Sequence, residues 1–230
     1  SSNLRHLFFQ QFLSLFYRIH SGDIVKGAAF RSLIPKNLNK FSTKTTLERL
    51  TDGYLFEDDN QTLFRSILLH FGTRGVTYLL NRVIQSLSRE ERLALINFIP
   101  LFGTLALPIL EEYLQKNPPW MVVRNILYIL GEIHCDSCYS FIKQCFSHED
   151  KRVQVEMISC VAKIGGGELV DRLLDGLERV DDELKGHIIQ FLVENFGSSK
   201  KVFEALCRLV EGRNTFSARS KNRLLGAAVA

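Results

Sequence analysis

The sequence predicts an all-α fold, in which about six helix pairs stack against one another. Two observations favour this fold class: a motif that recurs about every 31 residues, and apolar residues that recur in helical steps of three and four. Only 5 prolines and 15 glycines occur in 230 residues, which is typical of helices joined by tight turns. Because one helix pair cannot bury its apolar face alone, consecutive pairs are expected to pack together.

The N-terminal part is the least regular. Residues 4–19 place apolar side chains on one side of a helix, and we expect residues 1–40 to form an N-terminal helical cap. Residues 41–230 form the repeat domain, which we expect to be truncated at its C-terminus. At its start, Thr45 and Glu48 have the spacing of a capping box.

Each repeat is anchored by a bulky apolar residue. The anchors are Phe71, Phe102, Ile133, Ile164 and Phe196, separated by 31, 31, 31 and 32 residues, and Phe41 fits 30 residues earlier. A helix should end at each anchor, because glycine follows in most copies and can adopt the left-handed conformation. A second, shorter amphipathic helix follows, and Ser88 or the acidic residues of the next break should cap the helix after it.

The segment VVRNILYILGEIHCDSCYSFIKQCFSHEDKRVQVEMISCVAKIGG resembles two consecutive bacterial HEAT-like repeats of the PBS-lyase type. The matching positions are Val123-Arg124, the Leu130 to Ile133 stretch and Glu149-Asp150. The second copy departs from the pattern, with Gln154 and Ala162 in place of arginine and glycine. The resemblance implies a right-handed α-α superhelix, an armadillo-like α-solenoid, in a bacterial protein.

The stretch HCDSCYSFIKQCFSH, residues 134–148, has the residue types of a metal site or a redox dithiol. In the repeat register, however, Cys138 aligns with Leu169 and Cys145 with Gly176. Cysteine packs as a small hydrophobe, so both are predicted to be buried helix residues, and no metal or cofactor is expected. His134 and Cys135 remain unusual, because they occupy a turn where the resembled family prefers glycine and a polar residue.

Five cysteines without a secretory signal favour a reduced, cytoplasmic location. No apolar run reaches the roughly 20 residues of a membrane span. Residues 1–49 contain eight Lys or Arg and two acidic residues. Residues 200–230 contain seven Lys or Arg and two acidic residues, so both ends of the sequence are basic. Such ends could meet a phosphate backbone, and nucleic-acid binding is therefore an alternative function.

No motif assembles a nucleophile, a base and an oxyanion donor, so no enzymatic activity is predicted. The first hypothesis is a non-catalytic scaffold or regulatory module that binds another protein along the concave face. In the resembled family the second helix of each pair lines that face. The predicted contact residues are Arg74, Tyr78, Arg82, Lys143, Arg172, Lys201 and Arg208. A second alternative is an enzyme-associated, phycobilin-lyase-like module.

Overall fold

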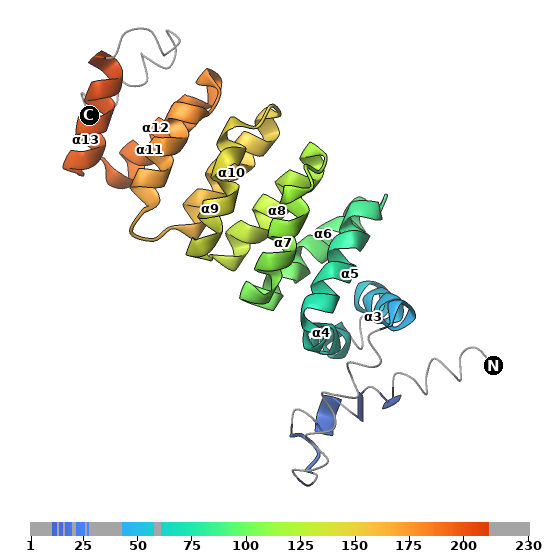
Figure 1. Ribbon diagram of the computed structural model, residues 1–230. Coiled ribbons are helices and arrows are strands. Elements are labelled where there is room, and N and C mark those ends of the chain that lie inside the picture. The colour runs from blue at the N-terminus through green and yellow to red at the C-terminus, as the bar shows by residue number, and fades with distance from the viewer. Residues whose placement is uncertain are drawn as a thin grey trace. The chain divides into compact units, whose positions relative to one another are not determined.

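The computed structural model describes residues 43–57 and 61–211, and single positions between 11 and 27. All the regular secondary structure of these residues is helical, which confirms the predicted fold class at this level (Figure 1). Most of the predicted cap, residues 1–40, lies outside the described residues, and all of residues 212–230 lie outside them. Both parts of that prediction stay predictions.

The chain divides into two compact units, Ser1–Ile109 and Leu110–Ala230. The helices of the first unit and of the boundary are α3 (Lys44–Phe56), α4 (Gln61–His70), α5 (Gly72–Gln85), α6 (Arg89–Phe98), the 3-10 helix η2 (Ile99–Ala106) and α7 (Leu107–Gln115). In the first unit, α4 packs against both α3 and α5, and α5 packs against α6 and η2.

The helices of the second unit are α8 (Trp120–Ile133), η3 (Asp136–Cys138), α9 (Tyr139–Ile142), η4 (Lys143–Ser147), α10 (Lys151–Ile164), α11 (Leu169–Arg179), α12 (Asp182–Phe196) and α13 (Lys200–Glu211). The first helices of consecutive pairs, α8, α10 and α12, lie side by side (Figure 1). Each second helix packs beside its own first helix in the pairs α10 with α11 and α12 with α13. The predicted alternation of first and second helices is therefore present within this unit.

The predicted left-handed turn follows four of the five anchors. Gly72, Gly103, His134 and Gly165 have φ between 52° and 66°, whereas Gly197 has φ −59° and stays in the right-handed helical region. Gly103 and Gly165 combine this φ with ψ near −137°, a combination that side chains disfavour strongly. His134 instead has ψ 38°, the αL conformation that histidine can adopt.

The chain after His134 also follows a different path from the chain after Gly165. The helix after Gly165, α11, is continuous over 11 residues, whereas the corresponding stretch after His134 is broken into η3, α9 and η4. The periodicity predicted the position of this second helix but not its irregular shape.

Helix caps agree with the sequence only in part. Ser88 and Asp150 accept backbone N–H groups at the starts of α6 and α10, as predicted. The capping box at Thr45 is wrong, because α3 begins at Lys44 and Thr43 accepts the N–H of Thr46. Asp181 precedes α12 without a side-chain capping hydrogen bond.

The core of the second unit fills the space between consecutive helix pairs. The Phe146 side chain of η4 is fully buried and lies over Gly176 of α11. A Cβ atom at Gly176 would lie 2.6 Å from the Phe146 ring. This close approach explains why the register places a small residue there.

Residues 89–115 form one segment whose length and apolar composition would allow it to span a membrane. The segment is bent at Gly103, whose backbone is not helical, and Leu95, Phe98 and Ile99 are fully buried. Its parts α6 and η2 pack against α5. Buried core helices of water-soluble proteins pass the same test, so the finding is a weak indication, and the expected lack of a span stays a prediction.

Candidate interaction site

The structure places three predicted contact residues on α5. Arg74 is exposed in the first turn, and Tyr78 and Arg82 follow at intervals of four residues, so all three lie along one side of the helix. Tyr78 and Arg82 are joined by a hydrogen bond between the phenol and the guanidinium. The helical spacing therefore places these residues on one side of α5, and their contact with a partner stays a prediction.

The Arg82 guanidinium is engaged within the first unit. It donates to Asp52 Oδ1 of α3 at 3.1 Å and to Glu91 of α6, and so connects three helices. Ser86 Oγ also donates to Glu91, at 2.7 Å. Arg82 thus stabilises the packing of the helices, and only some of its N–H groups are left for a partner.

The two carboxylates bound by Arg82 titrate differently. Burial alone would raise the pKa of Glu91, but hydrogen bonds from Ser86 and Arg82 outweigh burial and lower it. Burial raises the pKa of Asp52 more than the charge of Arg82 lowers it. Glu91 is therefore the main ionic partner of Arg82, consistent with its lower exposure.

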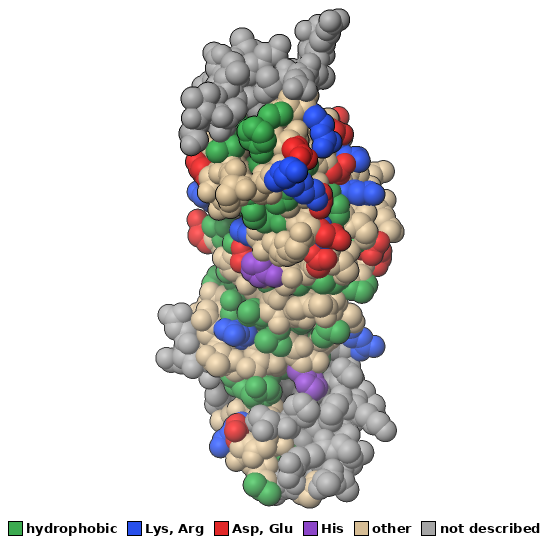
Figure 2. All heavy atoms as spheres, turned by 90° about the vertical axis from the view of Figure 1, so that its left-hand side faces the viewer, with side chains coloured by type: hydrophobic (Ala, Val, Ile, Leu, Met, Phe, Trp, Pro, Cys, Tyr) green, Lys and Arg blue, Asp and Glu red, His purple; other side chains and the backbone are tan. Residues whose placement is uncertain are grey.

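The predicted residues of the second unit do not form one cluster. Lys143 is exposed on η4, whereas Lys201 and Arg208 lie on α13. Lys201 pairs with Asp171 of α11, and Arg208 lies 3.8 Å from Glu204 with its side chain 78% exposed. Figure 2 shows Lys and Arg side chains interspersed with Asp and Glu on the described part of the face in view.

The position of Arg172 argues against its predicted contact role. Its side chain is only 5% exposed and donates to Asp136 Oδ1 at 2.6 Å and to Glu168 Oε2 at 2.8 Å. Its guanidinium also lies 4.7 Å from the centre of the Tyr139 ring. A polar side chain on a second helix predicts a contact residue. Neither property reveals that Arg172 is buried between two repeats.

The cysteine prediction is confirmed where it concerns burial. Cys138 and Cys145 are both buried, and desolvation raises their pKa values to about 12 and about 11. At neutral pH both therefore stay protonated, and a protonated thiol is a poor nucleophile. Among the described residues, no group of three His, Cys, Asp or Glu side chains is arranged to hold a metal ion.

The unusual turn residue His134 connects two repeats. Its Nδ1 lies 2.6 Å from the Lys163 carbonyl oxygen at the end of α10, and because a carbonyl only accepts, Nδ1 carries the proton. Cys135 is half-buried, with its sulfur 3.2 Å from Ser137 Oγ. The histidine imidazole thus ties the end of one first helix to the end of the next.

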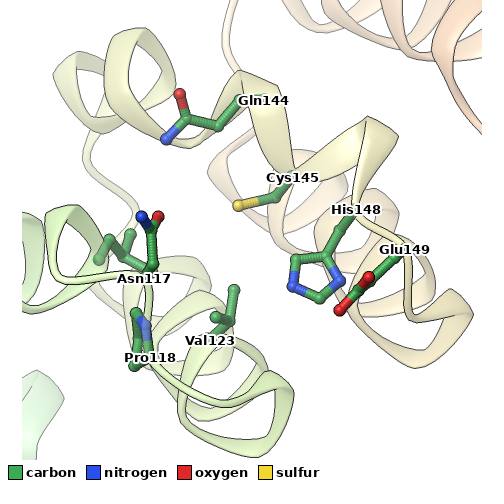
Figure 3. Close-up of a pocket in the computed structure, with 8 residues that line it drawn as sticks. Asn117, Pro118, Val123, Gln144, Cys145, His148 and Glu149 are labelled. Carbon is green, nitrogen blue, oxygen red and sulfur yellow. The ribbon is translucent and has the colours of Figure 1, made fainter.

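A pocket of about 360 Å³ opens between two turns of the second unit (Figure 3). Asn117 and Pro118 lie on one side of it, and Gln144, Cys145 and His148 face them from the other side. The sequence did not predict this pocket. Its walls come from the turn before α8 and the turn before α10, which lie one repeat apart, and only the 31-residue register could have suggested that they are neighbours.

The wall that carries His148 is held by a buried glutamine. Gln154 Nε2 donates to the His148 carbonyl at 2.7 Å, and Gln154 Oε1 accepts the backbone N–H of Asp181 at 2.8 Å. The backbone N–H of Asp150 donates to His148 Nδ1 at 2.9 Å. Nδ1 is therefore an acceptor, and the proton of the neutral imidazole lies on Nε2.

Comparisons of the chain with protein-family models, with curated proteins and with solved structures give no match.

Proposed function

We propose that the chain is a right-handed HEAT-like superhelix of about six helix pairs, that it binds another protein along the face formed by the second helices, and that it has no catalytic activity. Stacked repeats create extended surfaces that are suited to such binding.

The observation that carries this proposal is a set of ion pairs between equivalent positions of neighbouring repeats. Partners lie 30 to 32 residues apart in sequence, which is one repeat period. The pairs are Asp52 with Arg82 (3.1 Å), Arg124 with Glu156 (3.4 Å), Glu132 with Lys163 (2.6 Å), Lys151 with Glu183 (2.8 Å), and Asp171 with Lys201.

Each pair is partly exposed and contributes little stability alone. The ion pairs support repeat stacking because the same spacing of one repeat recurs within both units. Repeats that join in this way can continue to stack, and the second helices then form one surface. Arginine and tyrosine are favoured in protein interfaces, which makes Arg74 and Tyr78 the leading contact candidates.

The test is capture of protein partners by the immobilised chain, followed by titration with the purified partner. Arg74→Glu on the second helix α5 is compared with Arg65→Glu, an equally exposed arginine on the first helix α4. We expect Arg74→Glu to weaken binding and Arg65→Glu to leave it unchanged. Equal effects of the two substitutions, or no specific partner, would contradict the proposal.

The nucleic-acid alternative predicts a different result. Binding of a labelled DNA or RNA duplex would weaken steeply between roughly 50 and 200 mM salt, because each phosphate contact releases counterions. We expect no duplex binding at the lower salt concentration. The mixed charges in Figure 2 agree with this expectation for the face in view.

A further inference from the structure

The pocket between the turns before α8 and α10 combines unused polar groups with an apolar floor. Leu114 and Val123, both buried, form the floor, and buried Cys145 lies in the side that faces Asn117. The Asn117 and Gln144 amides make no hydrogen bond to other described residues. Their carbonyl oxygens are therefore available to a bound group.

Glu149 supplies the only carboxylate of the pocket lining. Most acidic side chains of the second unit have a basic partner, for example Asp150 with Arg152 and Glu156 with Arg124. Glu149 is exposed and forms no ion pair with a described residue. The pocket therefore presents an uncompensated negative charge next to His148, and the Asn117 and Gln144 amides lie across the pocket from it (Figure 3).

His148 adds one donor to this arrangement. Because its Nδ1 accepts from Asp150, the N–H of a neutral ring is at Nε2. Figure 3 shows the imidazole extending toward Pro118 and Val123. A carbonyl oxygen of a ligand could accept from this N–H, whereas the nearby carboxylate would repel an anionic ligand.

These features match a basic amino-acid side chain. Lysine and arginine have an apolar stem that packs on apolar surface and a cationic head that needs acceptors. The floor suits the stem, and the Glu149 carboxylate suits the head. His148 Nε2–H suits the backbone carbonyl of the residue that carries the side chain, and the Asn117 and Gln144 oxygens across the pocket suit N–H groups of the same segment. The cavity volume of about 360 Å³ can hold such a side chain.

We propose that this pocket receives a lysine or arginine side chain from an extended segment of the protein partner. The inference rests on the proposed protein-binding function and adds to it a site and a chemical preference. It also assigns a role to Glu149, His148, Asn117 and Gln144, none of which was a sequence-predicted contact.

The experiment is an NMR titration of the isotope-labelled full chain with three capped tripeptides, acetyl-Gly-Xaa-Gly-amide, in which Xaa is lysine, arginine or norleucine. We expect saturable shifts of the Asn117 and Gln144 side-chain amide signals with the basic peptides and not with norleucine. The tighter of the two basic peptides identifies the preferred head group. Equal shifts with norleucine, or no saturable shift with either basic peptide, would overturn the inference.

Two isosteric variants locate the charge. Glu149→Gln should weaken the basic peptide about two- to fivefold, as expected for an exposed ion pair. Glu178→Gln, which removes an exposed carboxylate of α11 outside the pocket, should have no effect. Unchanged affinity in Glu149→Gln would refute the site.

The results of the titration and of the partner capture distinguish failure of the pocket inference from failure of the proposed function. A partner captured equally well by the wild type and by Glu149→Gln would overturn the pocket inference and leave protein binding intact. A positive titration without any captured partner would contradict the proposed function and leave the pocket's preference intact.

Discussion

Replacing Gly165 with alanine tests whether the turn that ends α10 has the backbone conformation described. Gly165 has φ 66° and ψ −135°, which is unfavourable for any residue with a Cβ atom. A Cβ built there would have no neighbour closer than 3.9 Å. The cost of Gly165→Ala is therefore backbone strain, without a steric clash.

The expected magnitude follows from two opposing effects. Strain at such a conformation costs about 1–3 kcal/mol. Alanine also restricts the unfolded chain more than glycine does, and this effect stabilises the folded protein by about 0.4–1 kcal/mol. With the middle value of each range, the free energy of unfolding should therefore fall by about 1.3 kcal/mol.

Urea unfolding measured by the fluorescence of Trp120 provides the assay. Trp120 is the single tryptophan and lies in α8, which packs against α10. Its ring centre lies 3.3 Å from the Arg152 guanidinium carbon, so its emission should respond to loss of this packing. With a slope of about 2 kcal/mol per M, the urea midpoint should fall by roughly 0.5–1 M.

Gly167→Ala is the matched control in the same turn. Gly167 does not have positive φ, and a Cβ there would meet no atom within 4 Å. Its stability should change by no more than about 0.5 kcal/mol. If the two substitutions shift the midpoint equally, the left-handed turn after the Ile164 anchor is not formed as described.

Three further predictions follow. Gly176→Ala should lower stability by about 1–3 kcal/mol in the same urea assay, because the new Cβ would lie 2.6 Å from the Phe146 ring; a change below about 0.5 kcal/mol would contradict this packing. The pKa of Glu91 is lowered in the folded state, so its ionised form contributes stability above about pH 4.5 that is lost as the pH falls through the lower folded pKa. Glu91→Gln should therefore reduce the loss of thermal stability between pH 6 and pH 3, and an unchanged profile would refute the assignment. In alkylation at pH 8 followed by mass spectrometry, the buried Cys138 thiol, with a pKa of about 12, should react only after denaturation, whereas half-buried Cys135 should react in the folded chain; rapid labelling of Cys138 would show that it is accessible.

The helix positions could be predicted because an apolar anchor recurs and the residue after it has positive φ in four of the five copies, Gly197 being the exception. Phe71, Phe102 and Ile164 are buried, and the residue after each has positive φ. The register also identified Cys138 and Cys145 as buried, because it compared them with Leu169 and Gly176. Periodicity thus predicts positions that every repeat must fill in the same way.

The candidate site was harder to predict, because it depends on contacts between repeats. Arg172 looks like an exposed polar residue until Asp136, Glu168 and Tyr139 are placed around it. The pocket lies between the turns that carry Asn117 and His148, which are 31 residues apart, and no motif joins the two turns. Such features depend on how two turns face each other, and a single sequence does not record that.

The most direct test of the proposed continuous stack is chemical cross-linking of lysines in the dilute full chain, with mass spectrometric mapping. A superhelix predicts links between lysines of neighbouring repeats, such as Lys116 with Lys151 and Lys163 with Lys201. It also predicts that no intramolecular link joins Lys44 to Lys201, because several helix pairs separate them, each about 8–10 Å wide. Recovery of that long-range link would contradict the stacked arrangement.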